Sequence, residues 1–393
     1  MDGKVSMKPA PDKPSVLIVT LFSIPAGEVV FTKFLDLLKP LTNKLSVITS
    51  DYYQGSYEGT EIIRVKKPNI QEFIFIRALK FFLRQFKLSC YVLKAARGAE
   101  IIIFFIGTKI YLLPLLCAKL LRKKLVVTAT GLQSKGTEIE YGRSLIGRSI
   151  TWVFRILERI NFSLADCIFV ESESAVNFLC LGRYRQKIRI GGGQSIHTSL
   201  FGIRKYLSAR ANLVGYIGRL MPSKGARNFV EAIPLVLRER EDLQFLIAGE
   251  GSLLNELRES IKRQNLKNKA EFMGWIPHHK LPDYLNELKL LVLPSYTEGL
   301  PGIVQHAMAC GTIVLAAPVG GIPDLIIEEK TGFILKNNSP QGIAQDVIRA
   351  LEHPGLDRIV LDARRLVEQE YSYEIMSQKH RLILKELLGK AKY

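Results

Sequence analysis

The sequence predicts an α/β protein with two doubly wound, Rossmann-like domains that face each other across a cleft. Short apolar runs that end at polar or glycine residues alternate with helix-like stretches, as they do in parallel βαβ units. The alternation is interrupted after Gly191-Gly192-Gly193 and restarts near residue 212, so the chain divides into two halves. Its 393 residues, 47% of them hydrophobic and 23% charged, suffice for two globular cores. Because ligands bind such domains at the carboxyl ends of their strands, the cleft is the expected site.

Five apolar runs are the expected strands of the first half, and helical stretches lie between most of them. The strands are Val16–Thr20, Leu45–Thr49, Ile101–Ile106, Leu125–Ala129 and Cys167–Val170, and two of the helices are Val29–Leu38 and Trp152–Leu164. The stretch 101–121 is strongly apolar, but Lys109, Pro114 and Lys119 exclude a membrane span, which needs about 20 residues largely free of charge. We expect a strand, a turn and a helix there.

Six apolar runs are the expected strands of the second half. They are Leu213–Ile217, Gln244–Ala248, Lys269–Met273, Leu290–Leu293, Thr312–Ala316 and Gly332–Leu335. We therefore place the first domain at residues 14–200 and the second at 205–370.

The net charge of +18 is concentrated in the first half of the chain. Residues 1–200 hold 29 lysines and arginines against 15 acidic residues, whereas residues 201–393 hold 26 against 22. This excess indicates an anionic partner, such as nucleic acid, an anionic membrane or a phosphorylated acceptor. We do not expect nucleic acid, because no motif for binding it accompanies the charge. Five scattered cysteines indicate a reducing compartment, and the polar, Pro-rich start predicts no signal peptide.

The most informative stretch runs from Leu290 to Leu325. It reads as a strand, a Glu-Gly turn at Glu298, a helix that opens with small residues, a second strand and a Gly-Gly turn. This order brings Glu298 and a run of backbone N–H groups to the carboxyl ends of two strands, where ligands bind. The N-terminus of the helix adds unpaired donors suited to a phosphate.

A second cluster of binding residues follows the strand at 213–217. Gly218-Arg219 ends the strand, and Lys224 lies on the far side of the turn that opens the next helix, expected at Asn228–Leu237. A guanidinium, an ammonium and a helix N-terminus together can hold a diphosphate. Most lysines and arginines are solvated loop residues, so this pair alone does not decide between the two interpretations.

Further strand ends favour the binding interpretation. Three further segments each carry a strand end or a glycine turn: Phe245–Gly251, Phe272–Pro277 and Gly320–Asp324. The first two precede the Glu298 turn in the sequence and the third follows it. Together these motifs resemble the nucleotide-sugar domain of family 4 glycosyltransferases (glycosyl transferases group 1), which are retaining enzymes of the GT-B fold. The resemblance covers nearly all of residues 213–335, and several motifs in order are far more specific than any one of them.

The resemblance implies a role for each motif. Arg219 and Lys224 would neutralise the donor diphosphate as it leaves, and Glu298 would contact the donor sugar. The donor-binding set would be Gly27, Gly218, Trp275, Ile276, Gly299, Leu300, Pro301 and His306. Trp275 and Ile276 would flank the base of UDP or GDP. Neither a metal nor another cofactor is expected, because the family needs none.

Three polar positions depart from the family pattern. His306 stands where the family has a second glutamate, which accepts both ribose hydroxyls, whereas a neutral imidazole accepts one hydrogen bond at most. Thr130 stands where the family often has a histidine that touches the donor sugar, and His197 replaces an aspartate in the hinge. These changes keep open an alternative class, a catalytically impaired glycosyltransferase-like protein that acts as a binding or partner subunit.

A basic stripe is expected on the helix near residues 75–94. Its members are Arg77, Lys80, Arg84, Lys87 and Lys94. The expected flanks of the stripe are Phe81, Leu88, Tyr91 and Val92, and the expected core face is Phe75, Leu79, Phe82, Phe86 and Leu93. With Arg122, Lys123 and Lys124, the stripe suits an anionic membrane or an anionic acceptor, although an ordinary solvated helix face has the same pattern.

The resemblance therefore implies a retaining, metal-independent hexosyltransferase, and together with the basic first half it leads us to expect the protein at the cytoplasmic face of a membrane. It would transfer a sugar from a nucleotide diphosphate sugar to a lipid-linked acceptor or a polysaccharide precursor. The family also predicts that a terminal helix, Tyr373–Leu388 within residues 371–393, packs back against the first domain. An epimerase or phosphorylase of the same fold is less well supported, since nothing resembles a cofactor lysine or the carboxylates that those reactions need.

Overall fold

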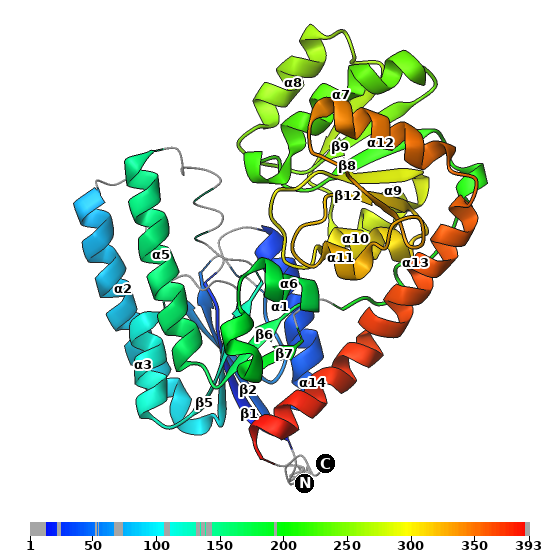
Figure 1. Cartoon of the computed structure of the whole chain (residues 1–393). Helices are drawn as coiled ribbons and strands as arrows, with labels where there is room; N and C mark the ends of the chain where they lie inside the picture. Colours follow the sequence, from blue (N-terminus) through cyan, green and yellow to red (C-terminus); the bar gives the residue numbers. More distant parts are fainter. Residues whose placement is uncertain are drawn as a thin grey trace, which may run out of the picture.

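The computed structural model consists of two parallel sheets, each covered by helices on both faces (Figure 1). It describes residues 13–21, 25–51, 53, 55–66, 74–105, 111–130, 134, 138, 144–191 and 195–389, without the side chains of residues 25, 26, 74–82, 84 and 146. Both sheets are all-parallel, with strand orders β3-β2-β1-β4-β5-β6-β7 and β10-β9-β8-β11-β12-β13. These orders confirm the predicted fold class of two doubly wound domains.

The first domain carries the seven-stranded sheet. Its strands are β1 (Ser15–Val19), β2 (Lys44–Ser50), β3 (Thr60–Val65), β4 (Ile101–Phe104), β5 (Lys124–Ala129), β6 (Cys167–Val170) and β7 (Ile188–Ile190). Its helices are α1 (Pro25–Leu38), α2 (Ile74–Ala95), α3 (Leu112–Leu120), α5 (Leu145–Leu164) and α6 (Glu173–Phe178). The sequence missed β3 and β7, which lie at the two edges of the sheet. Edge strands have a neighbour on one side only, so they carry a weaker apolar signal than central strands.

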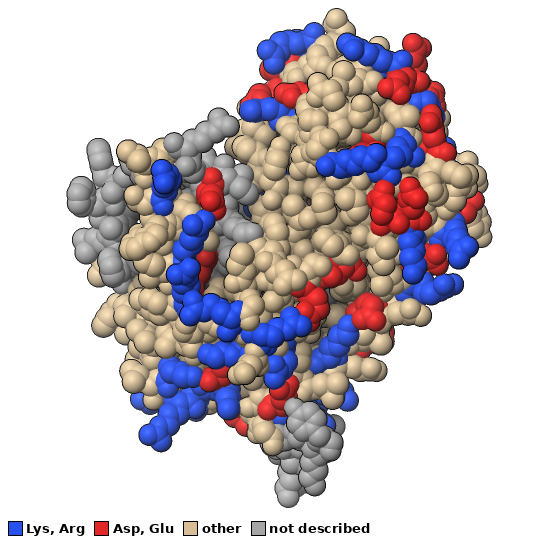
Figure 2. Space-filling view, viewed as in Figure 1, with Lys and Arg blue, Asp and Glu red and all other residues tan. Residues whose placement is uncertain are grey.

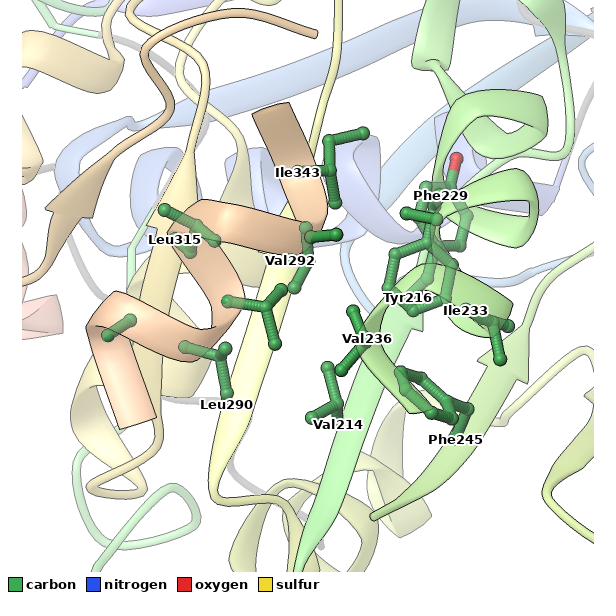
Figure 3. Close-up of a cluster of buried hydrophobic side chains, with 14 of the residues drawn as sticks. Val214, Tyr216, Phe229, Ile233, Val236, Phe245, Leu290, Val292, Leu315 and Ile343 are labelled. Carbon is green, nitrogen blue, oxygen red and sulfur yellow. The ribbon is translucent and has the colours of Figure 1, made fainter. Parts of the chain in front are cut away.

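The second domain carries the six-stranded sheet. Its strands are β8 (Leu213–Ile217), β9 (Gln244–Ala248), β10 (Ala270–Gly274), β11 (Leu290–Leu293), β12 (Ile313–Ala316) and β13 (Phe333–Ile334). Its helices are α7 (Ala226–Glu239), α8 (Leu254–Arg263), α9 (Leu281–Glu287), α10 (Gly302–Ala309), α11 (Ile322–Leu325), α12 (Pro340–Glu352) and α13 (Leu356–Tyr371). Apolar side chains of α7 and α12 meet those of the central strands in one buried cluster (Figure 3). This core holds the strand ends rigidly in place.

The chain returns to the first domain through α14 (Tyr373–Leu387), which lies against α1 (Figure 1). Tyr373 donates its hydroxyl to the Asp36 carbonyl at 3.1 Å, and Glu386 pairs with Arg189. The buried His380 ring packs edge-on against Phe34 and Phe169. Ile383 and Leu384 of α14 join a buried cluster of the first domain, so this helix packs into the first domain.

The predicted faces of α2 are wrong at four of the positions whose side chains are described. Leu88 and Val92, expected to flank the basic stripe, are fully buried, whereas Phe86 and Leu93, expected in the core, are 67% and 39% exposed. Small and polar residues of α2 complete its buried face, so the apolar pattern alone did not identify it. The side chains of Arg77, Lys80 and Arg84, and those of Phe75, Leu79, Phe81 and Phe82, lie outside the described residues, and Lys87 and Lys94 are exposed.

One buried guanidinium, that of Arg210, anchors the segment that leads into β8 of the second domain. Arg210 is 4% exposed and donates to the carbonyls of Leu285, Leu288 and Cys310 and to the hydroxyl of Thr312, at 2.6–3.2 Å. Leu285 and Leu288 lie in and just after the last turn of α9, and Cys310 and Thr312 follow α10, so the guanidinium joins two helix ends to the start of β8.

We predict that Arg210→Ala lowers the free energy of unfolding by about 3 kcal/mol, because it leaves several buried carbonyls without a donor. Denaturant unfolding measures this effect. Arg204→Ala is the matched control, since its exposed ion pair with Asp283 is worth about 1 kcal/mol or less. Equal losses in the two variants would contradict the role assigned to Arg210.

Candidate active site

The candidate site lies where the strand order of the second sheet reverses, between β8 and β11. The loop after β8 carries Lys224, and the loop after β11 carries Glu298. In open parallel sheets the crevice at such a reversal is the usual ligand site. The topology therefore brings together two residues that are 74 positions apart in the sequence.

Lys224 and Glu298 form an ion pair. The Lys224 ammonium lies 2.7 Å from Glu298 Oε1 and also donates to the Thr297 carbonyl at 2.8 Å. Each side chain is only 12% exposed, so the pair is better shielded from water than the surface ion pairs of the protein. The pair fixes an ammonium at the strand reversal, where it can meet an anionic ligand.

The turn that carries Lys224 requires a glycine. Gly225 adopts a left-handed conformation with φ 68°, and a Cβ there would overlap the carbonyl oxygen of Pro294, which follows β11. The Tyr216 hydroxyl donates to the Arg219 carbonyl at 2.8 Å and shapes the same turn. The two loops are therefore held at a fixed separation.

The first domain closes directly onto the Glu298 loop. A Cβ on Gly299 would overlap both the Thr130 carbonyl oxygen after β5 and the Glu171 carboxyl after β6. A Cβ on Gly321 would likewise lie against the Ser172 hydroxyl. The carboxyl ends of the two sheets therefore meet at backbone distance, which only glycines allow.

Glu171 is a site residue that the sequence analysis missed. It is 6% exposed and accepts the Leu300 N–H at 2.8 Å. Burial, and then the nearby Glu298 carboxylate, raises the pKa of Glu171 to about 8, although the Leu300 hydrogen bond opposes the shift. The available signal was an acidic residue immediately after the expected strand Cys167–Val170. The Leu300 N–H, expected to bind the donor, is thus bonded to the first domain in this closed arrangement.

A second polar contact between the two domains lies beside the hydrogen bond of Glu171 to Leu300. Ser174 donates its backbone N–H and its hydroxyl to the two carboxylate oxygens of Asp324, at 2.8 and 2.6 Å. The N-terminus of α6 thereby meets α11, on the same side of the cleft as Gly321. Closure consequently rests on specific hydrogen bonds and not on apolar packing alone.

His306 is not open to the cleft, contrary to the expectation of a donor-facing side chain in this closed arrangement. It is 5% exposed, and its Nε2 lies 2.8 Å from the ammonium of Lys33 on α1. Phe201 stacks on the imidazole with ring centroids 4.2 Å apart. Lys33 had no sequence signal, because one lysine on an amphipathic helix resembles any other.

The remaining predicted residues lie at several places around the cleft. Arg219 is exposed at the end of β8, and the Gly218 N–H bonds the Ala248 carbonyl. Trp275 is 41% exposed, whereas Ile276 is buried. Gly27 lies buried in the first turn of α1, where backbone N–H groups have no partner within the helix, and Pro301 immediately precedes α10. Of the basic groups after α3, Arg122 and Lys124 are exposed and Lys123 is partly exposed.

The second domain matches a known family. Residues 203–369 match the family model described as glycosyl transferases group 1. Over 132 residues the chain is 30% identical to the phosphatidylinositol N-acetylglucosaminyltransferase GPI3 subunit of Saccharomyces cerevisiae, which covers 34% of this chain and 29% of that protein. Over 161 residues it is 30% identical to the alpha-D-kanosaminyltransferase of Streptomyces kanamyceticus, and this match covers 41% of this chain and 42% of that protein. The chain spans less than half the length of these curated relatives.

Solved structures resemble the whole chain in fold. Anabaena Alr3699/HepE in complex with UDP and glucose aligns with a TM-score of 0.72 and 17% identity, over 96% of this chain and 100% of that one. Sucrose-phosphate synthase from Thermosynechococcus elongatus aligns with a TM-score of 0.76 and 18% identity, over 96% of this chain and 100% of that one. At these identities the likeness establishes the two-domain GT-B fold.

We predict that Glu171→Gln stabilises the protein at alkaline pH. The unfolded carboxyl ionises near pH 4.5 and the folded one near pH 8, so the folded state retains a proton that the unfolded state releases. Stability therefore falls as pH rises through this window, and glutamine removes the fall while keeping the acceptor for Leu300. We expect a gain on the order of 4 kcal/mol at pH 8 and none below pH 4.5 in denaturant unfolding.

The matched control is Glu173→Gln, since Glu173 lies two residues further on and its side chain is 56% exposed. This control should not change the pH profile. A Glu171→Gln profile parallel to that of the unaltered protein would contradict the raised pKa.

Proposed function

Because the chain carries a group 1 glycosyltransferase domain on a GT-B fold, we propose that it is a retaining, metal-independent hexosyltransferase. Its donor is a nucleotide diphosphate sugar, and its acceptor is a lipid-linked saccharide or a polysaccharide precursor at the cytoplasmic face of a membrane. The observation that carries the proposal is the shielded Lys224–Glu298 pair at the strand reversal of the second sheet.

The donor proposal rests on the chemistry of the two loops. A diphosphate needs cations and backbone N–H groups, which Lys224, the exposed Arg219 and the start of α10 provide. The similar structures of HepE include complexes with UDP and with UDP-glucose. UDP and GDP are therefore the nucleotides to test, with position 306 beside the ribose as the family resemblance implies.

The proposed mechanism stabilises the leaving group. Negative charge grows on the diphosphate as the glycosidic bond breaks, and a positioned ammonium in a shielded crevice stabilises that charge better than water does. Lys224 supplies the ammonium, while Glu298 orients it and lies beside the donor sugar. The acceptor then attacks the same face from which the diphosphate leaves, so the reaction retains configuration without a protein nucleophile.

The acceptor proposal rests on the outer surface of α2, α3 and α5, which lie side by side on one face of the first sheet (Figure 1). Large apolar side chains are exposed there, namely Phe86 at 67%, Leu120 at 83%, Leu145 at 80% and Trp152 at 64%. Lysines and arginines gather over the first domain, whereas both signs mix on the second (Figure 2). Apolar side chains among cations suit an anionic bilayer.

Two further observations agree with a lipid-linked acceptor. A cavity of about 870 Å³ opens on α5 and is lined by Leu145, Trp152 and Val153 together with Arg148 and Arg155. The yeast relative is named for a phosphatidylinositol acceptor. No helix in the described part of the chain is long and apolar enough to cross a bilayer. We therefore propose peripheral contact with the membrane surface.

We predict that Lys224→Ala lowers kcat at least about a hundredfold, because it removes the charge that stabilises the departing diphosphate. Release of UDP or GDP from the corresponding sugar donors measures turnover. Arg227→Ala is the matched control, since Arg227 lies in the first turn of α7 and forms an exposed ion pair with Glu256 of α8. Unchanged turnover in Lys224→Ala would contradict the mechanism, and no turnover in the unaltered protein with nucleotide still bound would favour a binding subunit.

We predict that Trp152→Glu combined with Leu120→Glu weakens binding to vesicles of anionic phospholipid at least about tenfold. Each change removes apolar area that the bilayer would bury and adds a negative charge that the anionic lipids repel. Vesicle co-sedimentation measures the binding. Leu361→Glu is the control, because Leu361 is 59% exposed on α13 of the second domain. Equal binding by the unaltered protein, the double variant and the Leu361→Glu control would contradict the proposed membrane surface.

A further inference from the structure

A carboxyl of the first domain is buried in the contact that closes the cleft. Glu171, directly after β6, is 6% exposed and accepts the Leu300 N–H of the second domain at 2.8 Å. The Thr130 carbonyl oxygen lies beside the same carboxyl oxygen, because a Cβ on Gly299 would overlap both. Two oxygens that crowd one point repel each other unless a hydrogen lies between them, and a protonated carboxyl can supply that hydrogen. The geometry of the contact therefore favours the neutral acid.

The groups around Glu171 do not offset a negative charge on it. In the described part of the chain Glu171 forms no ion pair, and the Leu300 N–H is its one hydrogen-bond donor. The Lys224 ammonium is already bound by Glu298 and by the Thr297 carbonyl. The titratable groups on the surrounding elements are Glu298 after β11, Asp324 on α11, Tyr371 at the end of α13, and Glu173 on α6, which pairs with Arg185. An ionised Glu171 would therefore be a buried and uncompensated anion, which is costly.

Opening the cleft would remove this cost. Gly299 and Leu300 belong to the second domain, so separation of the domains lets water reach the Glu171 carboxyl. In the closed contact burial, and then the Glu298 carboxylate, raises the pKa of Glu171 to about 8, whereas a solvated glutamate ionises near pH 4.5. Closure therefore takes up a proton between these two pH values. The ratio of closed to open protein falls as pH rises through this window.

Two other contacts between the domains respond differently to pH. Ser174 donates two hydrogen bonds to Asp324, and neither of its donors ionises in this range. Lys33 contacts His306 at 2.8 Å with His278 beside it, and burial lowers the pKa of all three groups. Closure there releases protons, so a rise in pH favours it. Of the described groups at these three contacts, Glu171 is thus the one whose ionisation opposes closure.

We propose that protonation of Glu171 controls closure of the cleft: the two domains close on the neutral carboxyl and separate when it ionises. The proposal concerns the contact itself, and it does not depend on the reaction proposed above. Its consequence is that a ligand held between the two domains is held more tightly at neutral than at alkaline pH. Glu171 thereby makes the opening of the cleft sensitive to pH.

Hydrogen exchange of the Leu300 amide in the full chain, between about pH 6 and pH 8, tests the proposal. Opening of the cleft breaks the hydrogen bond of this amide to Glu171, so its protection factor measures the ratio of closed to open protein. The comparison is with Glu171→Gln, which keeps an acceptor for Leu300, cannot ionise, and leaves Lys33 and both histidines unchanged. Across this range the protection factor should fall about fiftyfold further in the unaltered protein than in Glu171→Gln.

Ser174→Ala is the matched control, because it removes one hydrogen bond of the closed cleft and no titrating group. It should lower the protection factor of Leu300 about fivefold throughout the range and leave the pH dependence unchanged. A protection factor that varies with pH equally in the unaltered protein and in Glu171→Gln would overturn the proposal. So would one that rises with pH relative to Glu171→Gln, since an ionised Glu171 that stayed in the contact would bind the Leu300 N–H more strongly.

The amide of Val292, buried in the central strand β11, separates opening of the cleft from unfolding. Leu300 should be less protected than Val292, because opening exposes Leu300 while the core of the second domain stays folded. Equal protection of the two amides throughout the range would mean that the contact breaks only on unfolding, and it would also overturn the proposal.

Discussion

The site depends on one steric constraint: the two sheets meet through backbone at Gly299. No side chain fits there, because the Thr130 carbonyl and the Glu171 carboxyl of the first domain occupy the space. The same holds for Gly321 against Ser172. Glycine at these two positions therefore serves the close approach of the two domains. Any larger residue would separate the sheets and move Glu298 and α10 away from the first domain.

Two carboxyls near this contact are held in different environments. Glu298 is paired with Lys224 and orients the ammonium proposed to meet the diphosphate. No cation of the described residues lies beside Glu171, and burial favours its neutral form up to about pH 8. A neutral acid adjacent to a phosphate site avoids the repulsion that a second carboxylate would cause. The first domain thus contributes a polar contact to the closed cleft without adding negative charge where an anion is proposed to bind.

The sequence predicted the fold and the residues of the second-domain loops because both depend on local patterns. Strand β8, the Lys224 turn and the Glu298 stretch each have a distinct signature, and parallel topology brings their ends together. Contacts between domains have no such signature. Glu171 and Lys33 act through partners 129 and 273 positions away, so only the folded chain reveals them. The faces of α2 were predicted wrongly because apolar residues lie on both its buried and its exposed sides.

Hydrogen exchange of the full chain, with and without saturating UDP or GDP, tests the central claim most directly. That claim is that a nucleotide binds between the loops after β8 and β11 while the first domain closes over it. The account predicts slower exchange at residues 218–225, at residues 298–306 and in α1. Slower exchange confined to other parts of the chain, or none at all with nucleotide bound, would contradict it.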